Sequence, residues 1–183
     1  MTPAMQTVLQ DDRLLLRPMT SADHDVLFAV ASDREIWAIH PAHDRWQALV
    51  FRAFFDERLA SGGALVAIDR STGDAIGSSC YDTINAGNGE VEIGWTYLAR
   101  AYWGGVWNRS MKRLMLEHAF TRFETAIFLV GTDNMRSRRA MEKIGGRLTE
   151  RRLTVVRGGQ PIEHLIYVIT REEFAQGPLS HLP

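Results

Sequence analysis

The chain has 183 residues, 45% hydrophobic and 23% charged, which is typical of one globular domain, expected here over residues 1–183 with a folded core over about 13–174. A net charge of −1 lacks the basic excess of a nucleic-acid-binding protein, so no nucleic-acid partner is expected. A single cysteine, Cys80, excludes an internal disulfide, and six scattered histidines argue against a zinc site, so no metal is expected.

The first predicted elements are a strand and two helices. Leu14–Pro18 is an apolar strand that ends at its proline. Thr20 or Ser21 then begins a helix that extends from about Asp23 to Ser32. A second helix ends at Ser61-Gly62-Gly63. Apolar residues near helical spacing are expected on its buried face: Trp46, Leu49, Val50, Phe54 and Leu59.

The middle of the chain predicts three antiparallel strands in a meander. They are expected over Ala64–Asp69, Ala75–Ile84 and Glu90–Leu98. The segments between them are rich in glycine, asparagine and aspartate, which are strong turn signals.

The last third of the chain alternates helices with strands. A long helix after Gly105 has a wide apolar stripe, which predicts burial against a sheet. A strand over Ala126–Val130 and a helix over Asn134–Ile144 follow. A hairpin of Leu148–Arg157 and Ile162–Thr170 completes the order. One mixed α/β (α+β) layer structure is therefore expected.

The start of the long helix is rich in glycine. A strand over Glu90–Leu98 leads to Gly104 and Gly105, just before the helix. The N-terminus of a helix exposes unpaired N–H groups and a partial positive charge, so it binds phosphate well. Neither a Walker sequence nor a dinucleotide fingerprint is present. From these residues alone, a phosphate site and a glycine-rich turn without a ligand both stay open.

Short motifs recur along the chain in a characteristic order: Leu14-Leu15-Leu16-Arg17-Pro18, Glu92-Ile93-Gly94-Trp95, Tyr102-Trp103-Gly104-Gly105, Asn134-Met135-Arg136-Ser137 and Met141-Glu142-Lys143-Ile144-Gly145. Together they resemble the GCN5-related N-acetyltransferase (GNAT) family, in particular its RimJ/RimL-like branch of ribosomal-protein N-terminal acetyltransferases. The resemblance extends from about Leu14 to Phe174. It implies a single-domain acyl-CoA N-acyltransferase fold, in which a mixed, mostly antiparallel and splayed sheet is flanked by helices.

The resemblance also implies where the co-substrate acetyl-CoA binds. Its pantetheine arm would lie between the fourth and fifth predicted strands, beside Ile93, Gly94 and Trp95. Its pyrophosphate would lie on the loop that leads into the long helix: Trp103, Gly104, Gly105, Val106, Trp107 and Asn108. Asn134 would contact the arm, with Ser137 and Arg138 nearby on the same helix. A simple N-cap stays open for Asn134, and a solvated position for Arg138.

The chain departs from the family pattern in the phosphate loop. Val106 stands where a second glycine is usual, and Asn108 where glycine or alanine is usual. Arg109 and Lys112 would supply charge that the backbone contacts lose. Both are also ordinary residues of a solvated helix surface.

Two residues carry the expected catalytic roles. Met141 stands where many relatives have a tyrosine that protonates the departing thiolate, so Ser137 is the nearest substitute, with capping as its alternative. Glu92 is expected to take the amine proton, because a buried carboxylate with a raised pKa suits a general base. A purely structural carboxylate is equally open, and Glu90, on the same strand face, is the second choice.

The predicted function is transfer of an acetyl group from acetyl-CoA to a primary amine by direct attack, without a covalent enzyme intermediate. The amine belongs to a protein N-terminus or to a small molecule. The candidates to line its pocket are Trp37, His40, His43, Trp46 and His164, and simple packing in the core stays open for each of them. The alternative is an acetyltransferase-like module that binds coenzyme A, or serves as an interaction scaffold, without reacting. The departures at Val106, Asn108 and Met141 favour that alternative.

Targeting signals are not evident in the sequence. Residues 1–10 have neither the pattern of a signal peptide nor that of a transit peptide, and no apolar run has the length of a membrane span. A cytoplasmic protein without a membrane partner is therefore expected. The identity of the acceptor and the oligomeric state, a homodimer included, stay open.

Overall fold

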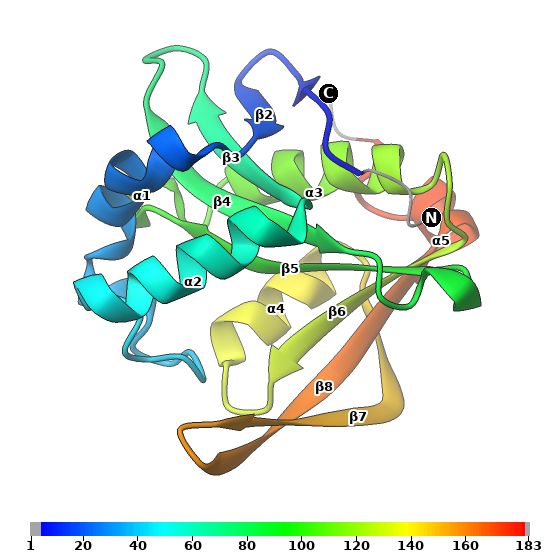
Figure 1. Ribbon diagram of the computed structural model, residues 1–183. Helices are drawn as coiled ribbons and strands as arrows, with labels where there is room; N and C mark the ends of the chain where they lie inside the picture. Colours follow the sequence, from blue (N-terminus) through cyan, green and yellow to red (C-terminus); the bar gives the residue numbers. More distant parts are fainter. Residues whose placement is uncertain (1–4, 182–183) are drawn as a thin grey trace.

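The strands form one sheet of eight within residues 5–181, the part of the chain that the computed structural model describes (Figure 1). Their spatial order is β1-β2-β3-β4-β5-β6-β8-β7. The strands are β1 (Leu9–Gln10), β2 (Leu14–Pro18), β3 (Ala64–Asp69), β4 (Ala75–Asp82), β5 (Glu90–Leu98), β6 (Thr125–Gly131), β7 (Arg147–Arg157) and β8 (Gln160–Thr170). The α-helices are α1 (His24–Ala31), α2 (Ala48–Ser61), α3 (Trp107–Ala119), α4 (Met135–Lys143) and α5 (Arg171–Gln176).

The predicted meander of β3, β4 and β5 is confirmed, and neighbouring strands are antiparallel throughout except for the parallel pair β5 and β6. β4 ends at Asp82 rather than Ile84, because the Asp82 carboxylate accepts a hydrogen bond from the Ile84 backbone N–H (2.8 Å) and turns the chain. The short strand β1 and the helix α5 have no counterpart in the sequence prediction.

Helices cover both faces of the sheet, and each face has its own core. Figure 1 shows α1 and α2 in front of the sheet and α3 behind it. Leu27 of α1 and Phe51 of α2 pack on one face, and Met111 of α3 and Met141 of α4 pack on the other. The two faces are called here the α2 face and the α3 face. Among the described residues, no helix has the length and hydropathy of a membrane span.

The buried side of α2 differs from the one that the sequence predicted. Phe54 is buried as expected, but Leu49 is 86% exposed and Trp46 precedes the helix. The buried residues are Phe51, Phe54, Phe55 and Arg58, which follow the i, i+3, i+4, i+7 spacing of one helix face. The prediction was wrong at Leu49, whereas Trp46 and Leu59 are partly buried against the same core as Phe54.

Replacing Phe51 by alanine tests this packing. Phe51 is fully buried, so Phe51→Ala is expected to lower the free energy of unfolding by about 3–5 kcal/mol through lost contacts and a cavity. Leu49→Ala, on the same helix, is the matched control and should change it by less than about 0.5 kcal/mol. Urea unfolding followed by circular dichroism measures both, and equal losses in the two variants would contradict the observed face.

Candidate active site

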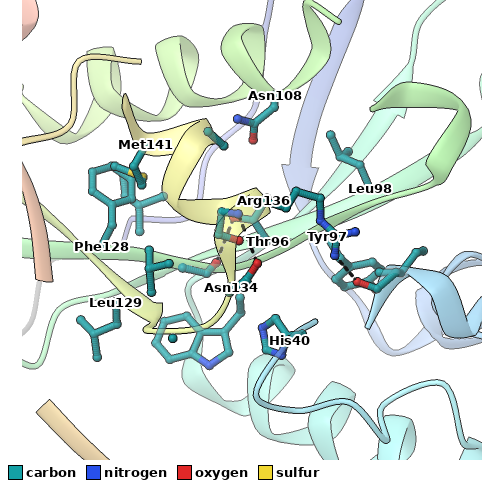
Figure 2. A pocket seen from close by; sticks show the side chains of 18 of the residues that line it. His40, Thr96, Tyr97, Leu98, Asn108, Phe128, Leu129, Asn134, Arg136 and Met141 are labelled. Atoms are coloured by element: carbon teal, nitrogen blue, oxygen red, sulfur yellow. Dashed lines mark hydrogen bonds between the residues drawn. The ribbon is translucent and has the colours of Figure 1, made fainter. Parts of the chain in front are cut away.

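β5 and β6 are neighbours along only part of their length. Residues 90–92 of β5 pair in parallel with residues 125–127 of β6. Beyond Glu92, β5 continues to Leu98 beside β4, while β6 continues to Gly131 beside β8. The divergence of the two strands is visible in Figure 1, and a cavity of about 240 Å³ lies where they part (Figure 2).

This cavity crosses the sheet from one face to the other. Trp37 and Tyr97, which line it, belong to the core on the α2 face. Ile93, Phe128 and Met141, which also line it, belong to the core on the α3 face. Two molecules that enter from opposite faces can therefore meet inside it.

Trp95 forms a β-bulge at the point where the cavity opens. Its φ of 53° is left-handed, a conformation that costs a residue other than glycine about 1–3 kcal/mol. The pairing with β4 shifts here by one residue, between Gly94 and Tyr97. As a result Ile93 and Leu98, five residues apart, both point to the α3 face, which a regular strand would not allow. The Arg58 guanidinium lies 4.1 Å from the Trp95 ring and holds it on the α2 face.

The loop from Trp103 to Asn108 has the geometry that a phosphate group needs. Gly104 has a φ of 70°, and the space where a side chain would stand is open. The last two residues of this loop, Trp107 and Asn108, already form the start of helix α3, whose first N–H groups have no partner within the helix. The Trp103 ring is fixed beside the loop, because its Nε1–H donates to the Leu98 carbonyl (2.8 Å).

α4 presents polar residues to the other side of the cavity. Asn134 is 3% exposed, and its side-chain oxygen accepts a hydrogen bond from the Ser137 backbone N–H (3.2 Å). The N-cap role is thereby confirmed, and the same residue lines the cavity. Ser137 and Met141, one turn apart, line the cavity beside it. The Arg136 side chain extends across the cavity (Figure 2). Its guanidinium donates to the Ile36 carbonyl (2.5 Å) and lies 4.0 Å from the Trp103 ring.

Most of the residues that the sequence singled out line this cavity: Ile93, Gly94, Trp95, Trp103, Gly104, Asn108, Asn134 and Ser137. Gly105, Val106, Trp107 and Arg138 do not line it. Val106 is exposed, Trp107 packs edge-on against Tyr102 (4.8 Å between ring centroids), and Arg138 donates to the Thr132 carbonyl (3.3 Å). Of the residues expected around the acceptor, Trp37, His40 and His164 line the cavity, whereas His43 and Trp46 do not.

Glu92 lies beside the cavity rather than in its lining. Glu92 is 9% exposed, and burial raises its pKa from 4.5 to about 7. The negative charge of Asp82, which pairs with Glu92 from β4, adds to the rise. Arg58 opposes the shift. A side chain at Gly94 would stand 3.2 Å from the Glu92 Oε1, so the missing side chain leaves the carboxyl room next to the cavity.

Lys112 lies where the sequence did not place it. It was expected near the phosphates on the helix surface, but it is 5% exposed and its Nζ donates to the Thr96 Oγ1 (2.6 Å). Thr96 and Phe128 also line the cavity and were not predicted. The sequence did indicate that Lys112 could be buried, because Met111 and Met115 place it next to the apolar stripe of the helix. A lysine at such a position is nevertheless usually interpreted as exposed to solvent.

The sequence model of the acetyltransferase (GNAT) domain matches residues 13–147. The chain belongs to the GNAT acetyltransferase family. This confirms the family that the sequence motifs resemble and the fold class expected from them. No curated protein matches the sequence.

Solved GNAT structures share the fold at low sequence identity. A GCN5-related N-acetyltransferase from Brucella melitensis superposes with a TM-score of 0.77 at 22% identity, over 94% of this chain and 82% of that one. A GNAT-family protein from Chromobacterium violaceum gives 0.80 at 18% identity, over 94% and 89%. RimJ from Mycobacterium smegmatis, solved in complex with CoA-disulfide, gives 0.73 at 19% identity, over 98% and 95%.

The raised pKa of Glu92 makes the stability of this GNAT domain depend on pH. The folded-state pKa lies above the unfolded value, so folding takes up a proton between about pH 4.5 and 7, and Glu92 lowers the stability as pH rises through that interval. Glu92→Gln removes this penalty. The variant is expected to be more stable than the wild type by up to about 3 kcal/mol at about pH 8, and by less than about 1 kcal/mol at about pH 5.

Urea unfolding of both proteins at the two pH values measures the difference. Glu90→Gln is the control, since Glu90 is held by Arg151 (2.6 Å) at the rim of the sheet and should show no comparable gain at high pH. A Glu92→Gln effect that is the same at both pH values would contradict a buried, proton-binding Glu92.

Proposed function

We propose that this GNAT acetyltransferase moves an acetyl group from acetyl-CoA to a primary amine, by direct attack of the amine nitrogen on the thioester carbon. The observation that carries the proposal is the cavity through the sheet where β5 leaves β6. A donor bound from the α3 face and an acceptor bound from the α2 face meet there, beside Gly94 and the Trp95 bulge. The acceptor amine belongs to a protein N-terminus or to a small molecule.

The α3 face fits coenzyme A in shape and in charge. The backbone N–H groups from Gly104 to Asn108, at the start of α3, would bind the pyrophosphate, which explains why Gly105, Val106 and Trp107 need not line the cavity with their side chains. Beyond Glu92, the edge of β5 that faces the gap offers N–H and C=O groups to the amides of the pantetheine arm, as a neighbouring strand would. Asn134, at the start of α4, would support the pantetheine arm. Arg138, on the same helix, would add positive charge for the 3′-phosphate of coenzyme A.

Glu92 is proposed as the group that takes the proton of the amine. An alkyl ammonium has a pKa well above neutrality and has no lone pair, so it must lose a proton before it attacks. A carboxylate with a pKa of about 7 is ionised enough to accept this proton near neutral pH and basic enough to hold it. Its place against Gly94, on the α2 face, supports this role, because the acceptor is proposed to enter from that face.

Ser137 is proposed as a hydrogen-bond donor to the sulfur that leaves. It lines the cavity on α4, one turn before Met141, whose thioether has no proton to donate. The amine nitrogen forms a bond to the acetyl carbon, the carbon–sulfur bond breaks, and its electron pair goes to sulfur. Before the attack the ammonium proton passes through Glu92 to solvent. As the amide forms, the nitrogen loses a second proton to Glu92 and the sulfur gains one, so the products are an acetamide and coenzyme A.

An assay of free thiol release tests the proposal. Purified protein with acetyl-CoA is offered peptides with free N-termini, amino acids, polyamines and aminoglycosides, and at least one class is expected to release coenzyme A thiol above the background hydrolysis. Glu92→Gln should then lower turnover at neutral pH by roughly ten- to a thousandfold, with partial recovery at higher pH where free amine is plentiful. Its affinity for acetyl-CoA should stay close to that of the wild type.

Glu90→Gln is the matched control, because it changes a carboxylate two residues away that is paired with Arg151. Binding of acetyl-CoA without thiol release for any amine would instead support the coenzyme A-binding module. Full turnover in Glu92→Gln at every pH would assign the amine proton to another group.

A further inference from the structure

Lys112 is a buried cation that faces the cavity from α3. It lies one turn after Asn108, and both residues line the cavity. Its Nζ donates to the Thr96 Oγ1 (2.6 Å) and to the Ser79 Oγ (3.3 Å), and lies 5.8 Å from the centroid of the Phe128 ring. Hydroxyl groups and an aromatic ring therefore surround the ammonium group.

This cation has no carboxylate partner among the described residues, whose ion pairs do not include Lys112. A buried charge without a counter-charge is costly, and a methionine would fill the same space without that cost. Burial alone lowers the pKa of Lys112 from 10.5 to about 7. A buried lysine that lines a cavity without a carboxylate partner is suited to stabilise a negative charge on a ligand in that cavity.

The part of β5 that Lys112 contacts determines which charge of a bound ligand it can meet. Thr96 follows the Trp95 bulge directly, and its hydroxyl contacts Lys112 on the α3 face. Glu92 and Gly94 lie just before the bulge, with the Glu92 carboxyl on the α2 face. The proposed base and Lys112 thus flank the same segment of β5 from opposite faces.

The chemistry of the proposed function, on which this inference rests, produces a negative charge on the Lys112 side. Coenzyme A enters along the α3 face, because its pyrophosphate site is at the start of α3. When the carbon–sulfur bond breaks, the electron pair stays on the sulfur, at the end of the pantetheine arm. Met141 cannot protonate this sulfur, and Ser137 is a neutral donor that stabilises a full charge weakly.

We propose that the Lys112 ammonium group offsets the charge of the departing coenzyme A thiolate and supplies its proton. The Nζ–H bond breaks as the S–H bond forms, which leaves a neutral lysine. Glu92 holds the proton taken from the amine, and exchange with solvent returns each group to its starting state. The balance is one proton removed from the amine and one added to the sulfur.

Two histidines of the lining, His40 and His164, are titratable, and burial lowers the pKa of each. The groups that face Lys112 are Ser79 from β4, Thr96 from β5 and Phe128 from β6, and none of them is charged at neutral pH. Arg136 of α4 is another cation of the lining, and its guanidinium is held at Ile36 and Trp103. Glu92 acts from the opposite face.

The test follows the thiol of bound coenzyme A, which needs no acceptor. The ultraviolet absorbance of the thiolate is titrated against pH for coenzyme A bound to the wild type, to Lys112→Met and to the control Arg113→Met. Arg113→Met removes a cation from the same helix, but one that pairs with Asp11 (3.2 Å) away from the cavity. Relative to Lys112→Met, the wild type should shift the equilibrium of the bound thiol toward thiolate by about tenfold or more, and Arg113→Met should match the wild type.

Turnover with an acceptor found in the thiol-release assay is the second readout. Lys112→Met is expected to lose roughly ten- to a hundredfold in turnover, with acetyl-CoA affinity within a fewfold of the wild type. Lys112→Gln, which keeps a hydrogen-bond donor for Thr96, replaces the methionine variant if that variant does not fold. It should show the same loss, because it has no charge.

The two proposals fail in different ways. A wild type that binds coenzyme A and shifts its thiol, but acetylates no amine, would overturn the proposed function and keep the role of Lys112 as a cation for the sulfur. Equal thiol titrations in the wild type and in both Lys112 variants would overturn that role, whatever the turnover. Failure of the wild type to bind coenzyme A would overturn both.

Discussion

The parting of β5 and β6 after Glu92 is the constraint on which the rest of the site depends. β6 pairs with β8 through to Gly131, and β5 pairs with β4 through to Leu98, so neither strand is free to close the gap. The facing edges are left with backbone N–H and C=O groups that need partners. An extended ligand with amide groups satisfies them as a strand would. The reactive end of that ligand then lies where the gap passes through the sheet.

The bulge at Trp95 and the charges around it follow from this arrangement. One extra residue in β5 reverses the side-chain alternation, so that Glu92 serves the α2 face and Thr96 turns toward Lys112 on the α3 face. Burial raises the pKa of Glu92 and lowers that of Lys112, to about 7 in each case. Both groups therefore exchange protons near neutral pH. Both groups are buried with little opposite charge nearby, which lowers the stability of the fold. They lie at the place where, in the proposed reaction, a proton leaves the amine and another reaches the sulfur.

Local signals predicted much of this site, and contacts between distant segments account for what they missed. The strand Glu90–Leu98, the glycine loop before α3 and the Asn134 cap depend on neighbouring residues, and all three are confirmed. The bulge depends on the register with β4, which the sequence of β5 does not contain. The inward direction of Lys112 depends on Thr96 and Ser79, which lie on other strands. The exposed Leu49 shows the same limit, because helical spacing alone does not fix which residue begins the buried stripe.

A crystal structure of the protein with coenzyme A would show whether the gap between β5 and β6 binds the acyl donor. We expect the pyrophosphate within hydrogen-bond distance of the backbone N–H groups between Gly104 and Asn108. We also expect the pantetheine amides to pair with β5 beyond Glu92, with the sulfur at the Trp95 bulge on the Lys112 side. Coenzyme A bound elsewhere, or a sulfur remote from both Glu92 and Lys112, would mean that the parting of the two strands has no part in binding the acyl donor.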